Sequence, residues 1–393
     1  MSFELQLFLI IYGVLSMSHL CVQYFFAHRH AERHKAKSYD FTTRVVVLVP
    51  IYNESPWRLR RCLTSLRRQT HRNLHIVAID DGSKNRKQLQ WVYEEFGKFS
   101  NVSIELLAKN AGKREAQHRG YLNHPDATLY LTVDSDTVLA SDAVAVMAAR
   151  FADSRIGAVT ADVTADNWRH SWLTRLIKVR YWSAFHVERA AQSYFNSVTC
   201  CSGPLSMYRG AALQKVWDKY IGQTFLGRPC TFGDDRHLTN LILREGFQAI
   251  FEPMASARTH VPERLFPDYV KQQWRWNMSF YREMLWNVTY LRNHHPYMAY
   301  DLAMQALLPF MLLAGLCITA IAALHGHEGV AFWYGLTALG MGLLRSIYGV
   351  WRTKDRNFLF FTVYGLLHVT VLIPLRIYSL ITLFARRTAW GTR

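Results

Sequence analysis

Long apolar stretches near the two ends of the chain flank a central region of mixed polarity. Residues 8–26 are predominantly apolar, and about 20 such residues suffice for a helix to cross a bilayer. Residues 302–324 and 330–350 have the same character. The pattern therefore predicts membrane-spanning helices on both sides of the central region.

A third C-terminal apolar segment, residues 358–384, contains Pro374 and Arg376 in its interior. Proline removes a helical hydrogen bond, and a charge inside lipid is costly. We therefore expect a bend or a re-entrant element here. Three straight C-terminal spans would instead put Arg393 on the outer side of the membrane.

The central region, residues 43–262, alternates between short apolar runs rich in β-branched residues and helical stretches such as residues 57–69. Such runs are typical of buried parallel strands. They occur at residues 45–50, 74–79, 127–133 and 156–160. The alternation predicts an α/β domain with a mostly parallel sheet, whose ligands bind at the carboxyl ends of the strands.

Two stretches, residues 168–192 and 267–287, mix aromatic and basic side chains at helical spacing. This composition favours amphipathic helices that lie in the membrane interface. Surface helices that pack on the α/β domain are the alternative interpretation.

Charge and cysteine content refine this picture. The net charge is +17, and a basic run at residues 28–37 follows the first apolar stretch, which predicts a cytoplasmic α/β domain. We expect membrane lipid and an anionic substrate as partners, and no nucleic acid. The six cysteines form no C-x-x-C pair, so neither a zinc site nor a disulfide scaffold is indicated.

Acidic residues follow two of the predicted strands directly. Asp80 and Asp81 come after the second strand, and Asp134 and Asp136 come after the third. Carboxylates in a D-x-D pattern can hold Mg²⁺ or Mn²⁺, which would neutralise a diphosphate leaving group. Turn formation or helix capping is the alternative role for such residues.

Two further motifs suit the same reaction. Lys113 and Arg114 follow a flexible segment and are suited to a pyrophosphate. Asp235 is our candidate for the carboxylate base that activates a sugar hydroxyl, with Asp234 as a structural or metal-side neighbour. A base opposite the leaving diphosphate would invert the anomeric centre. Asp234 is also a candidate helix cap.

Residues 271–276 lie on one of the predicted interface helices and end in an arginine and a tryptophan. Trp276 can stack on the apolar face of a sugar ring, and Arg275 can pair with phosphate. A plain membrane anchor is the alternative for these two side chains.

Together, these motifs resemble those of the processive family 2 glycosyltransferases, which include cellulose, chitin and hyaluronan synthases and the chitooligosaccharide synthase of nodulation. The matching residues are 49–54, 80–83, 134–136, 233–240 and the Gln272-x-x-Arg275-Trp276 motif. Within this group the chain is most similar to class I hyaluronan synthases. That likeness rests on residues 180–193, 201–209 and 223–227, and residues 390–393 resemble a gating segment that folds over the nucleotide site.

The resemblance implies a role for each matching residue. Asp81 would contact uridine, Lys113 and Arg275 the diphosphate, Asp136 the metal, Asp235 would be the base, and Trp276 would support the acceptor, with Cys201 near its path. The full set of UDP-sugar-binding candidates is Asp80, Asp81, Lys113, Arg114, Asp134, Gln272, Arg275, Trp390 and Arg393. Catalytic candidates are Asp234, Asp235, Arg275 and Trp276, and metal candidates are Asp134 and Asp136.

The resemblance also implies a layout in which a GT-A-like domain is inserted between transmembrane helices of the plasma (inner) membrane. We expect a monomer. The expected parts are an N-terminal span at 1–27, the catalytic domain at 43–262, interface helices at 263–299, C-terminal spans at 300–385 and a gating-like tail at 386–393.

Alternating transfer from UDP-N-acetylglucosamine (UDP-GlcNAc) and UDP-glucuronate (UDP-GlcA), coupled to polymer export, is the activity that this resemblance implies. A chitin-type synthase that uses UDP-GlcNAc alone is the alternative, because many hyaluronan synthases have two N-terminal spans and this chain shows one. A transporter or membrane scaffold with an inactive transferase domain is the competing class. Its weakness is that all the acidic motifs are intact.

Overall fold

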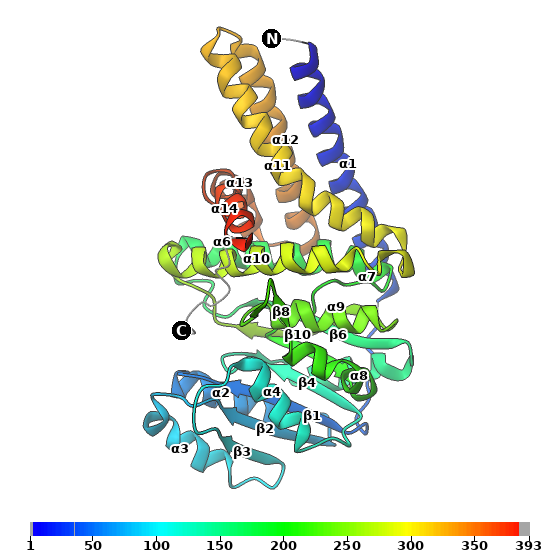
Figure 1. Ribbon diagram of the computed structural model, residues 1–393, viewed down its shortest axis with the longest axis vertical. Coiled ribbons are helices and arrows are strands. Elements are labelled where there is room, and N and C mark those ends of the chain that lie inside the picture. Colours follow the sequence, from blue (N-terminus) through cyan, green and yellow to red (C-terminus); the bar gives the residue numbers. More distant parts are fainter. Residues whose placement is uncertain (1–2, 35, 385–393) are drawn as a thin grey trace. The chain divides into compact units, whose positions relative to one another are not determined.

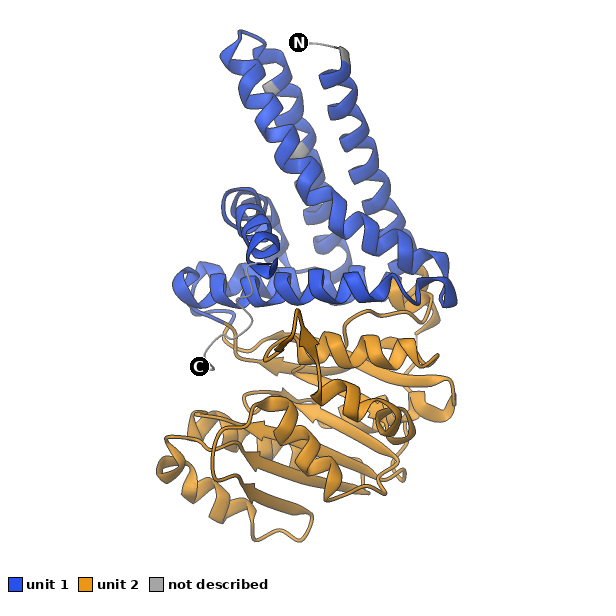
Figure 2. Cartoon of the chain, viewed as in Figure 1, with its two compact units in different colours: residues 1–28, 168–191, 262–385 blue, residues 29–167, 192–261, 386–393 orange. Residues whose placement is uncertain are grey.

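The computed structural model describes residues 3–34 and 36–384, and they divide into two compact units (Figure 2). The helical unit contains residues 3–28, 168–191 and 262–384. The sheet unit contains residues 29–34, 36–167 and 192–261. The aromatic and basic stretch expected around residues 168–192 thus belongs almost entirely to the helical unit. Each unit is built from segments that are far apart in the sequence.

An eight-stranded sheet forms the sheet unit, with the order β3-β2-β1-β4-β7-β6-β10-β5. Figure 1 shows its first four strands, β3, β2, β1 and β4, side by side. Its pairs are parallel, except that β7 runs antiparallel to β4 and β6, and β5 to β10. The predicted mostly parallel sheet and its four predicted strands are confirmed. The bounds are β1 Val45–Ile51, β2 Leu74–Asp80, β3 Val102–Leu106, β4 Leu129–Val133, β5 Val138–Leu139, β6 Ile156–Ala165, β7 Leu205–Arg209 and β10 Gln248–Thr259.

Helices cover this sheet through apolar faces and close backbone contacts. At Gly120 on α4, an added Cβ would lie 2.7 Å from Leu48 Cδ2 of β1 and 3.2 Å from Ile79 Cδ1 of β2. Glycine therefore lets α4 approach both central strands. The helices of the sheet unit are α2 Pro56–Arg67, α3 Arg86–Phe96, α4 Lys113–Leu122, α5 Ala143–Ala149, the 3-10 helix Arg150–Ala152, α8 Gly210–Ile221 and α9 Asp234–Arg244, and a small hairpin joins β8 Thr224–Phe225 to β9 Arg228–Pro229.

The order of the sheet determines where its ligands can bind. Strand β2 pairs with one side of β1 and β4 with the other, so the direction of strand order reverses at the β1–β4 pair. Ligands of open α/β sheets bind outside the carboxyl ends of strands at such a point. In this chain the three carboxyl ends lead into Glu54, Asp81 and Asp134.

The helical unit contains four helical segments that are long and apolar enough to cross a membrane. These helices occur where the sequence has its long apolar stretches, and their outward side chains, such as Ile10 and Phe332, are those that lipid would cover. The bounds are α1 Phe3–Arg33, which continues into the sheet unit, α6 Trp172–Ser183, the π-helix Ala184–Arg189, α7 Ala190–Tyr194, the π-helix Leu265–Tyr269, α10 Val270–Asn287, the 3-10 helix Leu291–Asn293, α11 Pro296–Leu324, α12 Glu328–Thr353, the 3-10 helix Arg356–Phe360, α13 Phe361–Leu367, the π-helix His368–Leu372 and α14 Ile373–Phe384.

The last apolar segment is irregular, as the proline in its interior predicts. A π-helical stretch, His368–Leu372, separates α13 from α14, and Pro374 is the second residue of α14. Proline cannot donate the helical hydrogen bond at its position, and the altered turn accommodates this loss.

Polar contacts connect the helices of this unit. Asp301 on α11 is buried and accepts hydrogen bonds from Gln23 Nε2 of α1 (3.2 Å) and Gln305 Nε2 (2.7 Å). Arg376 on α14 donates to the Gln305 carbonyl (2.7 Å) and to the Tyr281 hydroxyl of α10 (3.2 Å). These contacts satisfy polar groups that lipid cannot solvate.

A glycine makes possible the close approach of two loops at the carboxyl edge of the sheet. Gly82 has φ +69°, and an added Cβ would lie 2.4 Å from the Asn110 nitrogen and 2.5 Å from the Lys109 carbonyl carbon. Both are backbone atoms, so neither can rotate away. The loop after β2 therefore depends on Gly82 to rest against the segment that leads into α4.

We predict that Gly82→Ala lowers the thermal unfolding midpoint of the detergent-purified chain, because a backbone clash adds to backbone strain. The matched control is Gly246→Ala. Gly246 also has positive φ (+84°), but an added Cβ there would meet nothing within 4 Å. That control carries only the strain, about 1–2 kcal/mol. Midpoints that fall equally for the two variants would contradict the close approach.

Candidate active site

Asp80 holds the loop after β2 from inside the domain. Its side chain is fully buried and accepts hydrogen bonds from the Ser83 amide (2.7 Å), Arg86 Nη2 (2.9 Å) and the Tyr93 hydroxyl (2.6 Å). Burial alone would raise the pKa of Asp80, but the hydrogen bonds from Arg86, Tyr93 and Ser83 outweigh it and lower that pKa. Asp80 thus has an interior role here, and its contact with UDP stays a prediction.

Asp81 fastens the segment that carries Lys113. Its carboxylate accepts hydrogen bonds from Asn110 Nδ2 (2.9 Å) and from the Ala111 (2.7 Å) and Gly112 (2.9 Å) amides. Burial raises the pKa of Asp81 above its ordinary value, although the two amides act in the opposite direction. Because Asp81 fixes residues 110–112, it positions the first residue of α4. Its predicted uridine contact remains a prediction.

Lys113 connects two acidic motifs. Its ammonium lies 2.7 Å from Asp134 Oδ1, at the end of β4, and 3.1 Å from Asp234 Oδ2, at the start of α9. Burial disfavours the lysine charge, but Asp134 and Asp234 raise the pKa of Lys113 well above its usual range. The structure therefore brings together Lys113, Asp134 and Asp234, which the sequence places far apart.

Asp235 is held with its carboxylate beside this group. Its Oδ2 accepts a hydrogen bond from the Gly203 amide (3.2 Å) and lies 3.7 Å from the donating Cys200 thiol, while Oδ1 accepts from the Arg236 amide (2.8 Å). Burial and then the negative charge of Asp234 raise the pKa of Asp235.

The neighbouring Asp234 is shifted in the opposite direction. Burial disfavours its charge, but the Lys113 and Arg114 cations outweigh this effect and hold the pKa of Asp234 below its ordinary value. Two adjacent carboxylates are therefore differentiated by their surroundings, which is typical of sites that perform acid–base chemistry.

The D-x-D loop is anchored by side chains that our sequence analysis did not single out. The Ser135 hydroxyl donates to Glu54 Oε2 (3.1 Å), and the Thr259 hydroxyl donates to Asp136 Oδ1 (3.0 Å). The Cys62 thiol donates to the Asp134 carbonyl (3.7 Å). Glu54 belongs to the motif at residues 49–54, and its position after a predicted strand is the sequence feature that could have identified it as a site residue.

The carboxylates at the carboxyl edge of the sheet are compatible with a hard divalent cation that is also bound by its ligand. Asp134 and Asp136 carry carboxylate oxygens, the type of ligand that Mg²⁺ and Mn²⁺ prefer. The Lys113 ammonium against Asp134 shows that a positive charge is favourable at this place. Within residues 3–34 and 36–384, no group of three or more His, Cys, Asp or Glu residues forms a complete metal cage. A metal here would therefore need additional oxygens from its ligand, such as a diphosphate.

Two predicted binding residues point into the domain. Arg114 is 8% exposed and donates to the Tyr220 carbonyl (3.0 Å) and to Gln223 Oε1 (2.5 Å). Arg114 thus has interior partners in this structure, and its pyrophosphate contact stays a prediction. Cys201 is fully buried, and its neighbour Cys200 is the thiol that contacts Asp235.

Three of the remaining candidates belong to the helical unit. Gln272, Arg275 and Trp276 are on α10 of the helical unit, where Trp276 is 44% exposed and its ring centroid is 6.4 Å from that of Tyr181. Residues 390–393, which include the predicted nucleotide contacts Trp390 and Arg393, lie outside the described residues.

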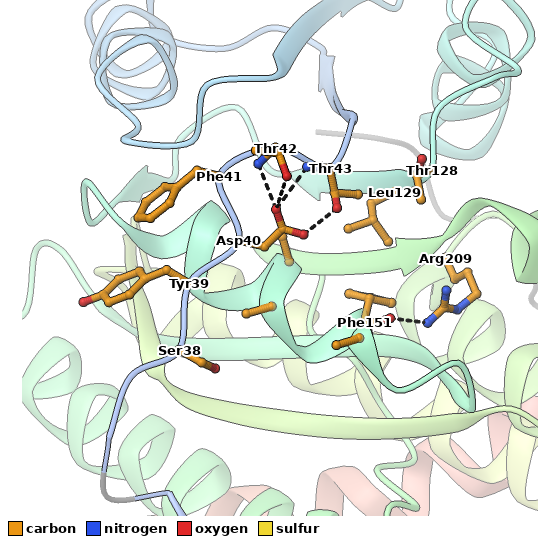
Figure 3. A pocket seen from close by; sticks show the side chains of 13 residues that line it. Ser38, Tyr39, Asp40, Phe41, Thr42, Thr43, Thr128, Leu129, Phe151 and Arg209 are labelled. Carbon is orange, nitrogen blue, oxygen red and sulfur yellow. Dashed lines mark hydrogen bonds between the residues drawn. The ribbon is translucent and has the colours of Figure 1, made fainter.

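A cavity of about 610 Å³ in the sheet unit lies away from these groups (Figure 3). It is lined by residues 38–43 and by the amino end of β4, whereas the acidic motifs follow the carboxyl ends of the strands. Its Arg209 donates to the carbonyls of Ile156, Phe151 and Asp153, and its Asp40 accepts from Thr42 and Thr43. These polar groups serve the local fold, so we do not assign the reaction to this cavity.

Known proteins are similar to this chain in sequence and in structure. An N-acetylglucosaminyltransferase of Azorhizobium caulinodans is 38% identical over 353 residues, which is 90% of this chain and 88% of the relative. One from Mesorhizobium japonicum is 39% identical over 341 residues, 86% of this chain and 80% of the relative. In structure, the chain is similar to the Pyrobaculum calidifontis mannosyltransferase solved with GDP-Man and Mn²⁺, with a TM-score of 0.65, 20% identity and 97% and 99% of the two chains covered.

The similarity to the mannosyltransferase structure shows a shared fold, and the two N-acetylglucosaminyltransferases show a shared family. The family described as "Glycosyltransferase like family 2" matches residues 43–279, which include every acidic motif described above and the Gln272-x-x-Arg275-Trp276 motif. This chain belongs to that family and is a glycosyltransferase.

Proposed function

We propose that this enzyme transfers GlcNAc from UDP-GlcNAc to a growing saccharide at the carboxyl edge of its sheet. The observation that carries the proposal is the meeting of Lys113, Asp134, Asp234 and Asp235 at that edge. The relatives named N-acetylglucosaminyltransferase, which match most of both chains, support GlcNAc as the sugar. They favour the chitin-type alternative of our sequence analysis over the hyaluronan synthase assignment.

Asp235 would act as the general base. It would take the proton from the acceptor hydroxyl as that oxygen attacks the anomeric carbon from the face opposite the diphosphate, which inverts the anomeric centre. The Gly203 amide and the Cys200 thiol fix the carboxylate in advance. Its raised pKa makes it a stronger base than an ordinary aspartate.

The donor would be held by groups of the same edge. Asp134 and Asp136 would hold Mg²⁺ or Mn²⁺, which when bound would neutralise charge on the diphosphate. Lys113 would pair with the diphosphate, and Asp81 would contact uridine. The proposed contributions of α10 are Gln272 and Arg275 to the diphosphate and Trp276 to the acceptor. Trp390 and Arg393 are proposed to complete the nucleotide site.

The apolar helices suggest where the reaction takes place. Four helices long enough to cross a membrane and the basic run at residues 28–37 support an integral protein of the plasma (inner) membrane with a cytoplasmic catalytic domain. A saccharide made on that side could leave through the helical unit.

Hyaluronan synthesis remains the second candidate, because residues 180–193, 201–209 and 223–227 resemble class I hyaluronan synthases. We predict that the purified full chain, given UDP-GlcNAc alone, makes a β-linked product that chitinase digests. UDP-GlcA should add no glucuronate to it. A polymer that forms only from both donors and is cut by hyaluronidase would reverse this order of candidates.

Replacing the proposed base tests the mechanism. We predict that Asp235→Asn lowers kcat by at least about 100-fold, since an amide cannot accept the acceptor proton. UDP affinity, measured by calorimetry, should change little. Asp126→Asn is the matched control, because Asp126 lies before β4 at the other edge of the sheet. Unchanged turnover in Asp235→Asn would remove Asp235 from this role.

The raised pKa of Asp235 predicts the acidic limb of the pH profile. A base works when it is deprotonated, so kcat/KM should fall as the pH decreases through the pKa of Asp235. That limb should lie above the ordinary aspartate value of about 3.9. UDP affinity measured over the same range separates loss of the base from loss of donor binding. A limb at or below about 4 would contradict the assignment.

A further inference from the structure

The position of the Lys113 ammonium shows how the acidic motifs are balanced without a ligand. Lys113 is the first residue of α4, and its Nζ contacts both Asp134 Oδ1 (2.7 Å) and Asp234 Oδ2 (3.1 Å). A Cβ added at Gly203 would lie 3.1 Å from Nζ, 3.6 Å from Asp134 Oδ2 and 3.8 Å from Asp235 Oδ2. One cation therefore lies among carboxylates of two motifs, beneath the backbone of Gly203.

Electrostatics explains why the cluster needs this cation. Like charges a few ångströms apart repel strongly in a partly buried place, and each carboxylate also loses hydration. The lysine pairs with Asp134 on the metal side and with Asp234 on the side of the proposed base. Asp234 acquires a defined role in this arrangement, because it holds the ammonium beside Asp134.

The same ammonium is also the proposed partner of the donor diphosphate. A bare divalent cation that approaches Asp134 would have to displace the ammonium or lie against its positive charge. A metal that arrives with a diphosphate brings negatively charged phosphate oxygens. The Lys113 ammonium can then move from Asp134 to these oxygens, while the metal binds Asp134. The two ligands would therefore favour each other.

We propose that Lys113 is the resident counter-ion of the acidic cluster, and that it makes divalent-metal binding dependent on the nucleotide. This inference rests on the proposed function, because it assumes a nucleotide diphosphate as the ligand of this edge. It adds an order of events: the cluster excludes free metal, and the metal and the diphosphate enter together as Lys113 changes partners.

Binding of Mn²⁺ to the full-length protein in detergent tests this inference without any turnover. Free Mn²⁺ is measured by its EPR signal during titration, with and without UDP. The wild type should bind Mn²⁺ weakly alone and at least about tenfold more tightly with saturating UDP. Lys113→Met should bind Mn²⁺ alone at least about tenfold more tightly than the wild type, because the competing charge is gone.

Three further variants make the result specific. Lys113→Arg keeps the charge and should keep the weak binding of Mn²⁺ alone. Lys109→Met removes a lysine four residues earlier and should behave as the wild type. Lys113→Gln replaces Lys113→Met if the latter fails to fold.

Three outcomes would overturn the inference, and they differ in what else they affect. If UDP binds but Mn²⁺ alone binds wild type and Lys113→Met equally, Lys113 is not the resident counter-ion and the proposed function stands. Tight Mn²⁺ binding by the wild type without UDP has the same meaning. If UDP fails to bind with or without Mn²⁺, both the inference and the proposed function fail.

Discussion

The proposed active site at the carboxyl edge of the sheet depends on a charge balance between clustered carboxylates and the Lys113 ammonium. Asp134 directly follows a strand and Asp234 begins a helix, and Lys113 contacts both of them. Separating these charges would leave the partly buried carboxylates uncompensated. The balance is possible because β1 and β4 are neighbours in the sheet, so that the loops after β2 and β4 lead to the same edge.

A second layer of contacts fixes these charged groups before any substrate arrives. Glu54 holds Ser135, Thr259 holds Asp136, and the Gly203 amide holds Asp235. Groups that are already oriented need no reorganisation when charge develops during the reaction, and this is a major source of enzymatic rate enhancement. The anchoring residues come from the loop after β1, the end of β10 and the loop before β7, so three separate parts of the sheet unit contribute to the orientation of the site.

Elements that depend on a local hydrophobic pattern could be predicted from the sequence. Elements and side-chain roles that depend on contacts with distant residues became visible only in the structure. Strands β1 and β2 are apolar runs and were predictable, whereas β7 (Leu205–Arg209) lacks β-branched residues and takes its place through antiparallel pairing with β4 and β6. The site shows the same division. Lys113 and Arg114 are adjacent basic residues, and the sequence alone does not distinguish their roles. Successive side chains on a helix differ in direction by about 100°, so Arg114 points into the domain. Glu54, Cys200 and Thr259 acquire their roles only through residues far away in the sequence.

The charge balance at this edge also bears on which sugar is transferred. In the proposed site, the diphosphate of any UDP-sugar would add negative charge beside Asp134, Asp136 and the Asp234–Asp235 pair, and Lys113 and a divalent cation would have to offset it. GlcNAc is neutral and adds nothing to this burden. Glucuronate brings a further carboxylate, which would need a cation of its own close to the ring. The acidic character of the edge therefore favours a neutral sugar, in agreement with the names of the relatives that cover most of this chain.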